Sequence, residues 1–467
     1  MQLLIPPWYR LPLSQVILVG FTCFCTTGMF SAVSNLGAGG TEDIALSDMA
    51  NGVHYGCFAI MGLFAGGVTN LLGVRPTLFL GAISYALYMG SLWCFQTQGT
   101  RWFVVFAGAI LGISAALLWS AQGAIMMSYP LEKDKGKAFA VFWAIFQSGS
   151  FLGAIIALAI NIQHGGLSAV STGTYLAFLI IMLIGTTSSL LVLPPASIVR
   201  GDGSLVKVQN LSSPREEIRS FFALFKDWRM LALTPMFFAS NYFYAYQGAI
   251  NTFYFDGPTR ALNAALEGAG AIVGALIIGI FVLDAPRFKR RMRGWLGLAF
   301  VSVCAVTVWS CALVWQTSFT RASNLGKMSY HDSAFAPKGT LYFFFYFSDA
   351  AYQALAYWIM GAITNDPFKL ARYAGFYKAI QSAGSAGSYG MDAVATPFLN
   401  EHLASWTMVL VSLPLAGLVI YHVHDTSYQD EQTVFANDSK VNNMQADVDP
   451  EAAGEPEKQE FTANTCA

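Results

Sequence analysis

Charged residues are scarce in this chain. Asp, Glu, Lys and Arg make up 11% of its 467 residues, whereas hydrophobic residues make up 55%. A soluble globular protein carries about 25% charged residues, because charged side chains cover the surface that faces water. The composition therefore excludes a water-soluble fold. The basic residues also form short, dispersed clusters instead of one stripe, so we do not expect nucleic acid as a partner.

Sequence signatures of catalysis and of cofactor binding are missing as well. The chain contains no Walker loop, no dinucleotide-binding fingerprint and no nucleophile elbow. Its His and Cys residues are not clustered at metal-ligand spacing, and six of the seven cysteines fall in apolar runs, where they act as small packing residues. We therefore expect no metal site, no cofactor and no enzymatic activity.

Long apolar runs dominate instead. A helix that crosses a bilayer needs about 20 mostly apolar residues, and twelve windows of that kind occur in the chain. We therefore predict an all-α, multi-pass membrane protein with twelve transmembrane helices in a lipid bilayer. The windows are residues 13–36, 49–72, 77–95, 102–128, 138–161, 173–193, 230–255, 262–283, 295–318, 340–363, 373–395 and 402–423.

The charges of the loops predict how the chain is oriented. When the loops alternate from a cytoplasmic N-terminus, 18 Lys and Arg residues lie inside and five lie outside, with the C-terminal tail not counted. Such an excess follows the positive-inside rule and predicts that both termini lie in the cytoplasm.

Composition divides the chain into four parts. Residues 1–193 and 229–424 hold six windows each, which predicts two six-helix halves. Residues 194–228 contain clustered turn-forming residues and read as a cytoplasmic linker. Residues 425–467 contain ten acidic and two basic residues and few large apolar ones, so we predict a disordered acidic cytoplasmic tail.

The two halves share an internal repeat. In residues 119–149 a Pro ends an apolar run, basic residues follow in a short turn, and a Gln-Ser pair stands in the next run; residues 358–384 repeat this order. Two parallel six-helix units joined by a cytoplasmic linker resemble the major facilitator superfamily. The resemblance implies a site between the halves, which alternates its access from one side of the membrane to the other.

The loop between the second and third windows resembles the signature of that superfamily, Gly-x-x-x-Asp-Arg-x-Gly-Arg-Arg. Gly66, Asn70, Gly73 and Arg75 keep its spacing. Asn70 stands in the place of the acid, and apolar residues replace two of the bases. Family members use these charges to close the cytoplasmic side, so we expect that charge network to be mostly missing here.

Longer motifs resemble a narrower branch, the uncoordinated-93-like proteins, in the form found in fungal multispan proteins. Members of this branch are connected with potassium-channel regulation, ion homeostasis and the trafficking of other membrane proteins, and most fungal-type members are transporters by inference only. The resemblance extends from the first window to the last. It is carried by residues 35–37, 119–124, 241–247, 251, 259–263, 349–353, 357–362 and 373–384.

Ionisable residues inside the apolar windows are candidates for function, because a charge at the middle of a bilayer costs at least ~2.5–3.5 kcal/mol unless it has a partner or water. Asp349 is the deepest acid, and Tyr352 and Gln353 follow at i+3 and i+4. One interpretation is a protonatable or cation-binding carboxylate that faces a central cavity. The other is a structural ion pair with Lys378, which can also extend to the cytoplasmic interface. Glu267 lies nearer the outer end, where it can stay hydrated.

Uncharged polar residues add a second set of candidates. Several of them share one side of the seventh window, and such a face cannot point at lipid without cost. Two interpretations stay open, namely contact with a solute and amide hydrogen bonds between helices. The set is Asn241, Tyr244, Gln247, Asn251, Gln122, Gln147 and Gln381.

Two hypotheses about function follow. The leading one is a secondary transporter of a small solute or ion that works by alternating access, with Asp349 as the coupling group. The alternative is a non-transporting regulatory or trafficking partner of another membrane protein, such as an ion channel. A hydrated central cavity that contains Asp349 and the polar face of the seventh helix favours transport, whereas a collapsed apolar centre favours the partner role.

Overall fold

A computed structural model describes residues 5–35, 44–164, 172–206 and 213–426. Residues 427–467, which make up almost all of the predicted acidic tail, lie outside this part of the chain, as do residues 207–212 of the predicted linker. Nearly all described residues are helical, and the pairings between extended segments are two isolated bridges within that part.

All six windows of the first half coincide with helices. The first helix changes from α-helix to π-helix and back, and the other five run without such a change. They are α1 (Pro12–Cys23), η3 (Phe24–Gly28) and α2 (Met29–Asn35) in the first window, then α3 (Ile44–Leu72), α4 (Val74–Gln98), α5 (Arg101–Ser128), α6 (Lys135–His164) and α7 (Thr172–Ser188).

The second half repeats the arrangement after the linker helix α8 (Pro214–Leu224). Its first predicted helix is broken in two by a turn at residues 240–243, which the apolar pattern did not predict. The helices are α9 (Trp228–Ala239), α10 (Tyr244–Tyr254), α11 (Gly257–Leu276) with the π-helix η7 (Ile277–Leu283), α12 (Arg290–Gln316), α13 (Phe335–Ile363), α14 (Pro367–Ala393) and α15 (Phe398–Tyr421).

Eight of the described helical segments are long and apolar enough to cross a membrane by length and composition alone. The others have identifiable reasons for missing that standard. The seventh is divided into α9 and α10, the sixth is short, and α13 and α14 contain many polar residues, Asp349 and Lys378 among them. The set as a whole gives the predicted twelve membrane-spanning units.

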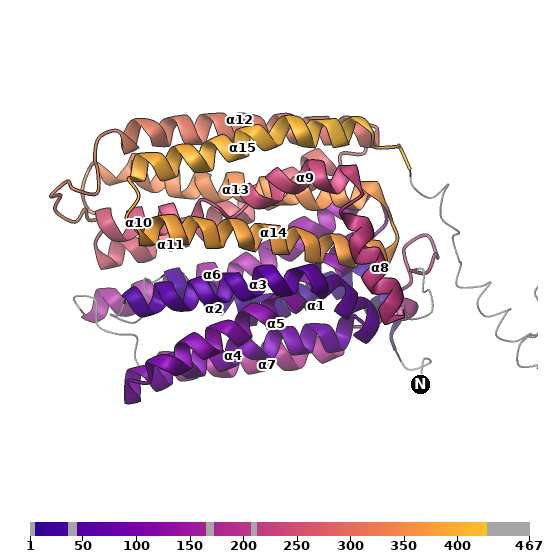
Figure 1. Cartoon of the computed structure of the whole chain (residues 1–467), viewed down its shortest axis with the longest axis horizontal. Helices are drawn as coiled ribbons and strands as arrows, with labels where there is room; N and C mark the ends of the chain where they lie inside the picture. Colours follow the sequence, from indigo (N-terminus) through magenta and orange to yellow (C-terminus); the bar gives the residue numbers. More distant parts are fainter. Residues whose placement is uncertain (1–4, 36–43, 165–171, 207–212, 427–467) are drawn as a thin grey trace, which may run out of the picture.

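The two halves form two layers that lie side by side (Figure 1). They meet where α3 packs against α14 and where α6 packs against α11. Figure 1 also places α8 and the N-terminal segment at the same end of the bundle. We call this end the linker end, and the opposite end, with the loop between α12 and α13, the distal end. The sequence predicts that the linker end is cytoplasmic.

Capping residues set where two helices begin at the linker end of the bundle. In α14, Pro367 occupies the first turn and the side chain of Asp366 accepts hydrogen bonds from the backbone N–H groups of Phe368 and Lys369. Helix α8 begins with a capping box in which Ser213 and Glu216 exchange side-chain to backbone hydrogen bonds. These caps position the basic and acidic residues that follow them at the linker end.

Candidate functional site

A cavity of about 830 Å³ lies between the two halves. Its wall extends from Arg321 and Lys327, in the loop at the distal end, to Trp119 and Lys378 in the centre of the bundle. Ligand pockets of proteins typically measure about 300–1,000 Å³. The cavity therefore has the size of a small-molecule site and is reached from the distal end.

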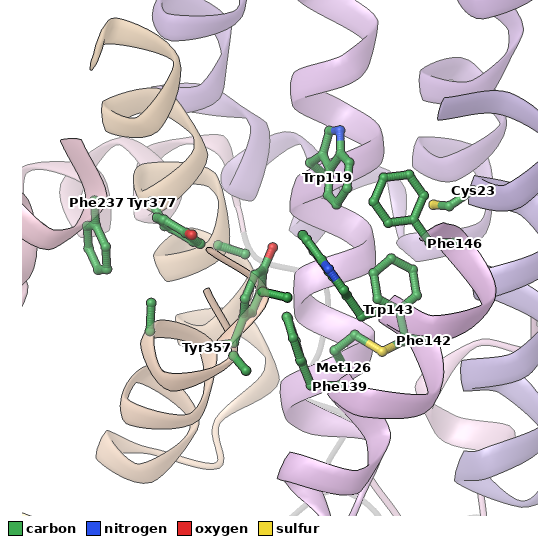
Figure 2. Packing of buried hydrophobic residues seen from close by; sticks show 14 of the residues in the cluster. Cys23, Trp119, Met126, Phe139, Phe142, Trp143, Phe146, Phe237, Tyr357 and Tyr377 are labelled. Carbon is green, nitrogen blue, oxygen red and sulfur yellow. The ribbon is translucent and has the colours of Figure 1, made fainter. Parts of the chain in front are cut away.

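Aromatic rings separate the cavity from the linker end. Trp119 and Trp143 line the cavity, and the rings of Phe139 and Trp143 are stacked with their centroids 5.0 Å apart. Phe139 in turn contacts Tyr357 of the second half, at 5.2 Å between centroids. Figure 2 shows these rings filling the space between helices of the two halves. We call Trp119, Trp143, Phe139 and Tyr357 the aromatic floor.

Lys378 reaches the deepest part of the cavity from α14. Its ammonium nitrogen lies 4.4 Å from the ring centroid of Trp119 and 4.9 Å from that of Tyr377, so both rings stabilise its charge by cation–π attraction. It also donates a 2.8 Å hydrogen bond to Oε1 of Gln381. Lys378 thus points into the cavity and does not extend to the membrane interface.

Asp349 lies one layer behind the cavity wall. Its Oδ2 accepts hydrogen bonds of 2.9 Å from both the Tyr244 hydroxyl and Nε2 of Gln353, and these two residues line the cavity in front of it. Its other oxygen, Oδ1, is buried and has no hydrogen-bond partner. The prediction that Asp349 faces the cavity is therefore wrong for this conformation, because Tyr244 and Gln353 cover it.

The alternative pairing of Asp349 with Lys378 is not a direct ion pair, since no ion pair within the described residues joins the two side chains. They are connected through two amides instead. Gln381 accepts from Lys378 and donates 3.2 Å to Gln353 Oε1, while Gln353 donates to Asp349. A change of charge at Asp349 or at Lys378 therefore acts on the other group through the oriented dipoles of the two amides between them.

Tyr352 does not join the network that the sequence predicts for it. Its hydroxyl lies 2.7 Å from Ser412 Oγ of α15 and donates to the carbonyl oxygen of Met236 in α9. Residues at i+3 and i+4 point about 100° apart around a helix. Gln353 faces Asp349 and the cavity, whereas Tyr352 holds α13 against its neighbours on the other side.

The broken seventh helix brings Asn241 to the cavity wall. Its Oδ1 accepts hydrogen bonds from Gln381 at 2.9 Å and from Gln353 at 3.3 Å, and Asn251 also lines the cavity. Irregular backbone at membrane depth is tolerated where it is buried in protein or lines a water-filled cavity. The break at residues 240–243 therefore lies at the cavity wall, and transporters with discontinuous helices bind their substrates beside such breaks.

The remaining polar candidates divide between the cavity and the packing. Gln147 lines the cavity, as does Glu267, whose carboxyl is hydrogen-bonded with Tyr346. Gln122 does not line the cavity and accepts a 3.2 Å hydrogen bond from the hydroxyl of Tyr357, a residue of the aromatic floor. Gln247 is buried away from the cavity lining, and its side-chain amide has no hydrogen-bond partner. The structure thus brings together Lys378, Gln381, Gln353, Asn241, Tyr244, Asn251, Gln147 and Glu267 around or just behind one cavity wall.

The linker end is closed by charged contacts that the signature loop did not predict. Asn70 donates hydrogen bonds of 3.2 Å to both carboxylate oxygens of Glu217, and Arg372 of α14 donates to the same oxygens at 2.9 and 3.1 Å. The expectation that this network is mostly missing is therefore wrong. Glu217 of the linker helix α8 supplies the acid that Asn70 replaces.

Gly73 and Arg75, two further positions of that signature, have structural roles. Gly73 has a φ of +85°, a backbone conformation that glycine adopts without strain, at the turn between α3 and α4. Arg75 donates a 2.7 Å hydrogen bond to the carbonyl oxygen of Val192, at the end of the first half. The signature loop lacks its own acid, and the linker contains acidic residues. Together these two features are the sequence signal that could have pointed to Glu217.

A second set of contacts joins the halves beside the aromatic floor. Lys135 at the start of α6 donates hydrogen bonds of 2.7 Å to the Gly361 carbonyl oxygen and to Asn365 Oδ1. Arg290 of α12 forms a 3.0 Å ion pair with Glu132. These groups lie in short loops and helix ends, so they can separate without unfolding a helix.

Asp284, in the loop between the eighth and ninth helices, forms a third contact. Its Oδ2 accepts a 2.6 Å hydrogen bond from the backbone N–H of Lys137, in the first turn of α6, where the helix dipole favours negative charge. Burial nevertheless raises the pKa of the Asp284 carboxyl from 3.8 to about 7, against the lowering effects of that N–H group and of Arg293. A carboxylate of one half thus caps a helix of the other.

This pKa predicts a pH-dependent stability. Because the folded chain holds the Asp284 proton more tightly than the unfolded chain, its stabilising contribution is full below about pH 3.9 and is lost as the pH rises to about 7. We expect the thermal unfolding midpoint of the parent to fall, relative to Asp284→Asn, between about pH 4 and about pH 7 and to change little above that. Asp202→Asn is the control, because the pKa of Asp202 is lowered and this group does not titrate in the same pH range. The unfolding midpoint of this variant, plotted against pH, should run parallel to that of the parent. Parallel curves for Asp284→Asn would contradict the assignment.

The fold is that of the major facilitator superfamily. The superfamily transporter FucP of Escherichia coli, solved in its outward conformation, superposes with a TM-score of 0.60 over 88% of this chain and 99% of that chain. The two sequences are 12% identical, so the likeness concerns the fold. It agrees with two six-helix halves around a central cavity.

Sequence relatives define the branch. Residues 48–421 match the family described as ion channel regulatory protein UNC-93. An UNC93-like protein of Schizosaccharomyces pombe is 39% identical, covering 88% of this chain and 83% of that protein. UNC93-like protein 1 of Arabidopsis thaliana is 37% identical, covering 88% and 91%. The chain belongs to the UNC-93 family, which confirms the resemblance seen in the motifs.

Proposed function

We propose that this chain is a non-enzymatic secondary transporter that moves a small solute through the central cavity by alternating access. The observation that carries the proposal is a cavity of about 830 Å³ that both halves line and that extends to one end of the bundle only. The polar face of the broken seventh helix forms part of its wall, as expected for a site at the interface of two repeats.

The contacts at the linker end support a rocking motion of the two halves. The groups around Glu217, Lys135 and Asp284 hold the halves together through ion pairs and hydrogen bonds that cross between elements. In our proposal these contacts break when the cavity opens toward the linker end, which the loop charges place in the cytoplasm. The present conformation is then the outward-facing one.

Asp349 is the proposed coupling group. It lies behind Tyr244 and Gln353, and its Oδ1 is buried without a partner, so an added proton or cation has an acceptor there. Through Gln353 and Gln381 its charge is connected to Lys378 in the cavity. Binding of a solute at Lys378 and binding of a coupling ion at Asp349 therefore affect each other, which is the requirement for coupled transport.

Replacement of Asp349 by Asn tests the coupling role. In proteoliposomes that contain a pH indicator, we expect the parent to move protons together with at least one member of a panel of sugars, amino acids, carboxylates and inorganic ions. Asp349→Asn should reduce proton movement and gradient-driven uptake at least tenfold, which corresponds to a coupling free energy of about 1.4 kcal/mol or more. Exchange of the solute in the absence of a gradient should stay unchanged. Asp332→Asn, an exposed acid in the distal loop, is the matched control. If no panel solute moves under any gradient, the transport proposal fails.

A regulatory or trafficking role is the second candidate, and the description of the family favours it. Helix α8 adds a structural observation, because Ile218 and Phe222 are 61% and 62% exposed at the linker end. Crosslinking and pull-down of the full chain, with Ile218→Ser beside the parent, would test this role. Recovery of a partner membrane protein whose behaviour changes when this chain is removed would support it, whereas unchanged behaviour of every recovered partner would contradict it.

A further inference from the structure

The wall of the central cavity carries more positive than negative charge. Its basic side chains are Arg260, Arg321, Lys327 and Lys378, and its acidic side chains are Glu267 and Asp392. Arg321 forms ion pairs with two carboxylates, those of Asp392 and, at 2.8 Å, of Glu401, so this group of three side chains carries no net positive charge. Among the lining residues outside this group, three basic residues and one acid remain, with Asp349 behind the wall.

None of the remaining basic residues forms a direct ion pair, although Asp349 acts on Lys378 and Asp256 acts on Arg260 from a longer distance. Within the part of the chain that the structure describes, no acid lies within 4.0 Å of Lys378, Arg260 or Lys327. Arg260 is 8% exposed, and its Nε has no hydrogen-bond partner although it lies on the cavity wall. Lys327 donates to two backbone carbonyl oxygens, those of Thr252 and Phe253, at 2.7 Å each. A buried arginine nitrogen without an acceptor is costly, unless a ligand supplies one.

The deepest basic residue lies beside aromatic rings. Lys378 has the Trp119 ring at 4.4 Å, and Trp143 and Phe146 also line the cavity next to it. An ammonium group has three donors and no acceptor, and one hydrogen bond of Lys378 goes to the Gln381 side chain. The site thus offers a positive group and a flat apolar surface within one small volume.

We propose that the cavity binds a small organic anion, and this inference rests on the proposed transport function. Lys378 holds the anionic group, and Trp119 and Trp143 pack against the apolar or aromatic part of the ligand. Arg260 and Lys327, nearer the distal end, attract the anion on its way in. A cavity of about 830 Å³ is far larger than an inorganic ion needs, which favours an organic anion.

Binding to the purified full chain tests the inference independently of transport. Benzoate, phenyl phosphate, benzamide, benzylammonium and chloride are titrated by calorimetry and by the shift of the thermal unfolding midpoint, which rises only with ligands that bind the folded form. We expect benzoate or phenyl phosphate to bind at least tenfold more tightly than neutral benzamide, and the tighter of the two identifies the carboxylate or the phosphate as the preferred group. Equal binding of benzamide, preference for benzylammonium, binding of chloride alone, or no saturable binding up to ~10 mM would each overturn the inference.

Variants assign the site. Lys378→Gln should lower the preference for the anion over benzamide at least tenfold. Lys378→Arg should retain most of this preference, because the positive charge remains. Arg260→Gln should weaken anion binding severalfold, whereas Lys226→Gln, an exposed lysine at the linker end, should leave it unchanged. Unchanged preference in Lys378→Gln would overturn the assignment. Anion binding without solute movement in vesicles would disprove transport but not the anion site. Uptake of neutral solutes alone would support transport and overturn the anion site.

Discussion

Gly66→Val is expected to hold the linker end open. A Cβ atom at Gly66 would lie 2.5 Å from the Cα of Arg372 and 2.6 Å from the carbonyl oxygen of Ala371, and both atoms belong to the backbone of α14. Backbone cannot move aside as a side chain can, so α3 and α14 must separate. Overpacking of this kind costs about 1–3 kcal/mol, which shifts a two-state equilibrium about 5- to 150-fold.

Spin labels at the linker end measure that separation. Lys133→Cys in the first half and Lys289→Cys in the second half provide exposed attachment sites, in a background whose native cysteines are replaced by Ser. We expect the distance distribution to move to longer values in Gly66→Val. Gly52→Val lies in the same helix, where an added Cβ meets no atom within 4 Å, and should keep the parent distribution. Identical distributions for both variants would show that α3 and α14 do not limit closure.

The single variants Asn70→Asp and Glu217→Gln are each expected to break the contact at the linker end, and the double variant is expected to restore it. Asn70→Asp places a second carboxylate 3.2 Å or so from Glu217, and Glu217→Gln leaves Arg372 without its acid. Removing one partner of a buried ion pair costs about 3–5 kcal/mol. Each single variant should therefore open the linker end and lower the thermal unfolding midpoint.

The double variant should recover most of both losses, because one acid again faces Arg372. Contacting residues typically show interaction energies of about 0.5–3 kcal/mol in such cycles. The same spin-label pair and the unfolding midpoint are measured in all four proteins. Glu216→Gln is the matched control, since Glu216 is exposed and Gln can keep the capping box with Ser213. A double variant that is as open as the worse single variant would show that Glu217 does not replace the missing acid.

Helix positions could be predicted from the sequence because the bilayer dictates them. Apolar windows such as 102–128 and 402–423 coincide with α5 and α15, since a spanning helix must match the thickness of the hydrocarbon region. The break at residues 240–243 was not predicted. Its residues are polar and aromatic in a mostly apolar run, and a single window cannot show that neighbouring helices satisfy the freed backbone groups.

The candidate site was predicted in its residue types and only partly in its geometry. Lys378 lines the cavity, and Gln353 contacts Asp349 at i+4 as predicted. Tyr352 points toward α15 instead, because a helix period alone does not say which side of a wide polar face meets the cavity. Arg260 and the aromatic floor were missed, since single basic and aromatic residues carry no spacing signal that distinguishes them from ordinary loop charges and packing.

The sequence by itself determined the environment of this protein, its twelve helices, its repeat and its family, because each depends on local composition or on the order of residues along the chain. Tertiary structure decided that Asp349 lies behind Tyr244 and Gln353, that Glu217 of α8 meets Asn70 and Arg372, and that the cavity ends at the aromatic floor. These facts depend on how helices from distant parts of the chain rotate and pack against one another. The physical reason is that solvation by lipid selects apolar segments one at a time, whereas burial of a charge is settled only by the partners that packing brings to it.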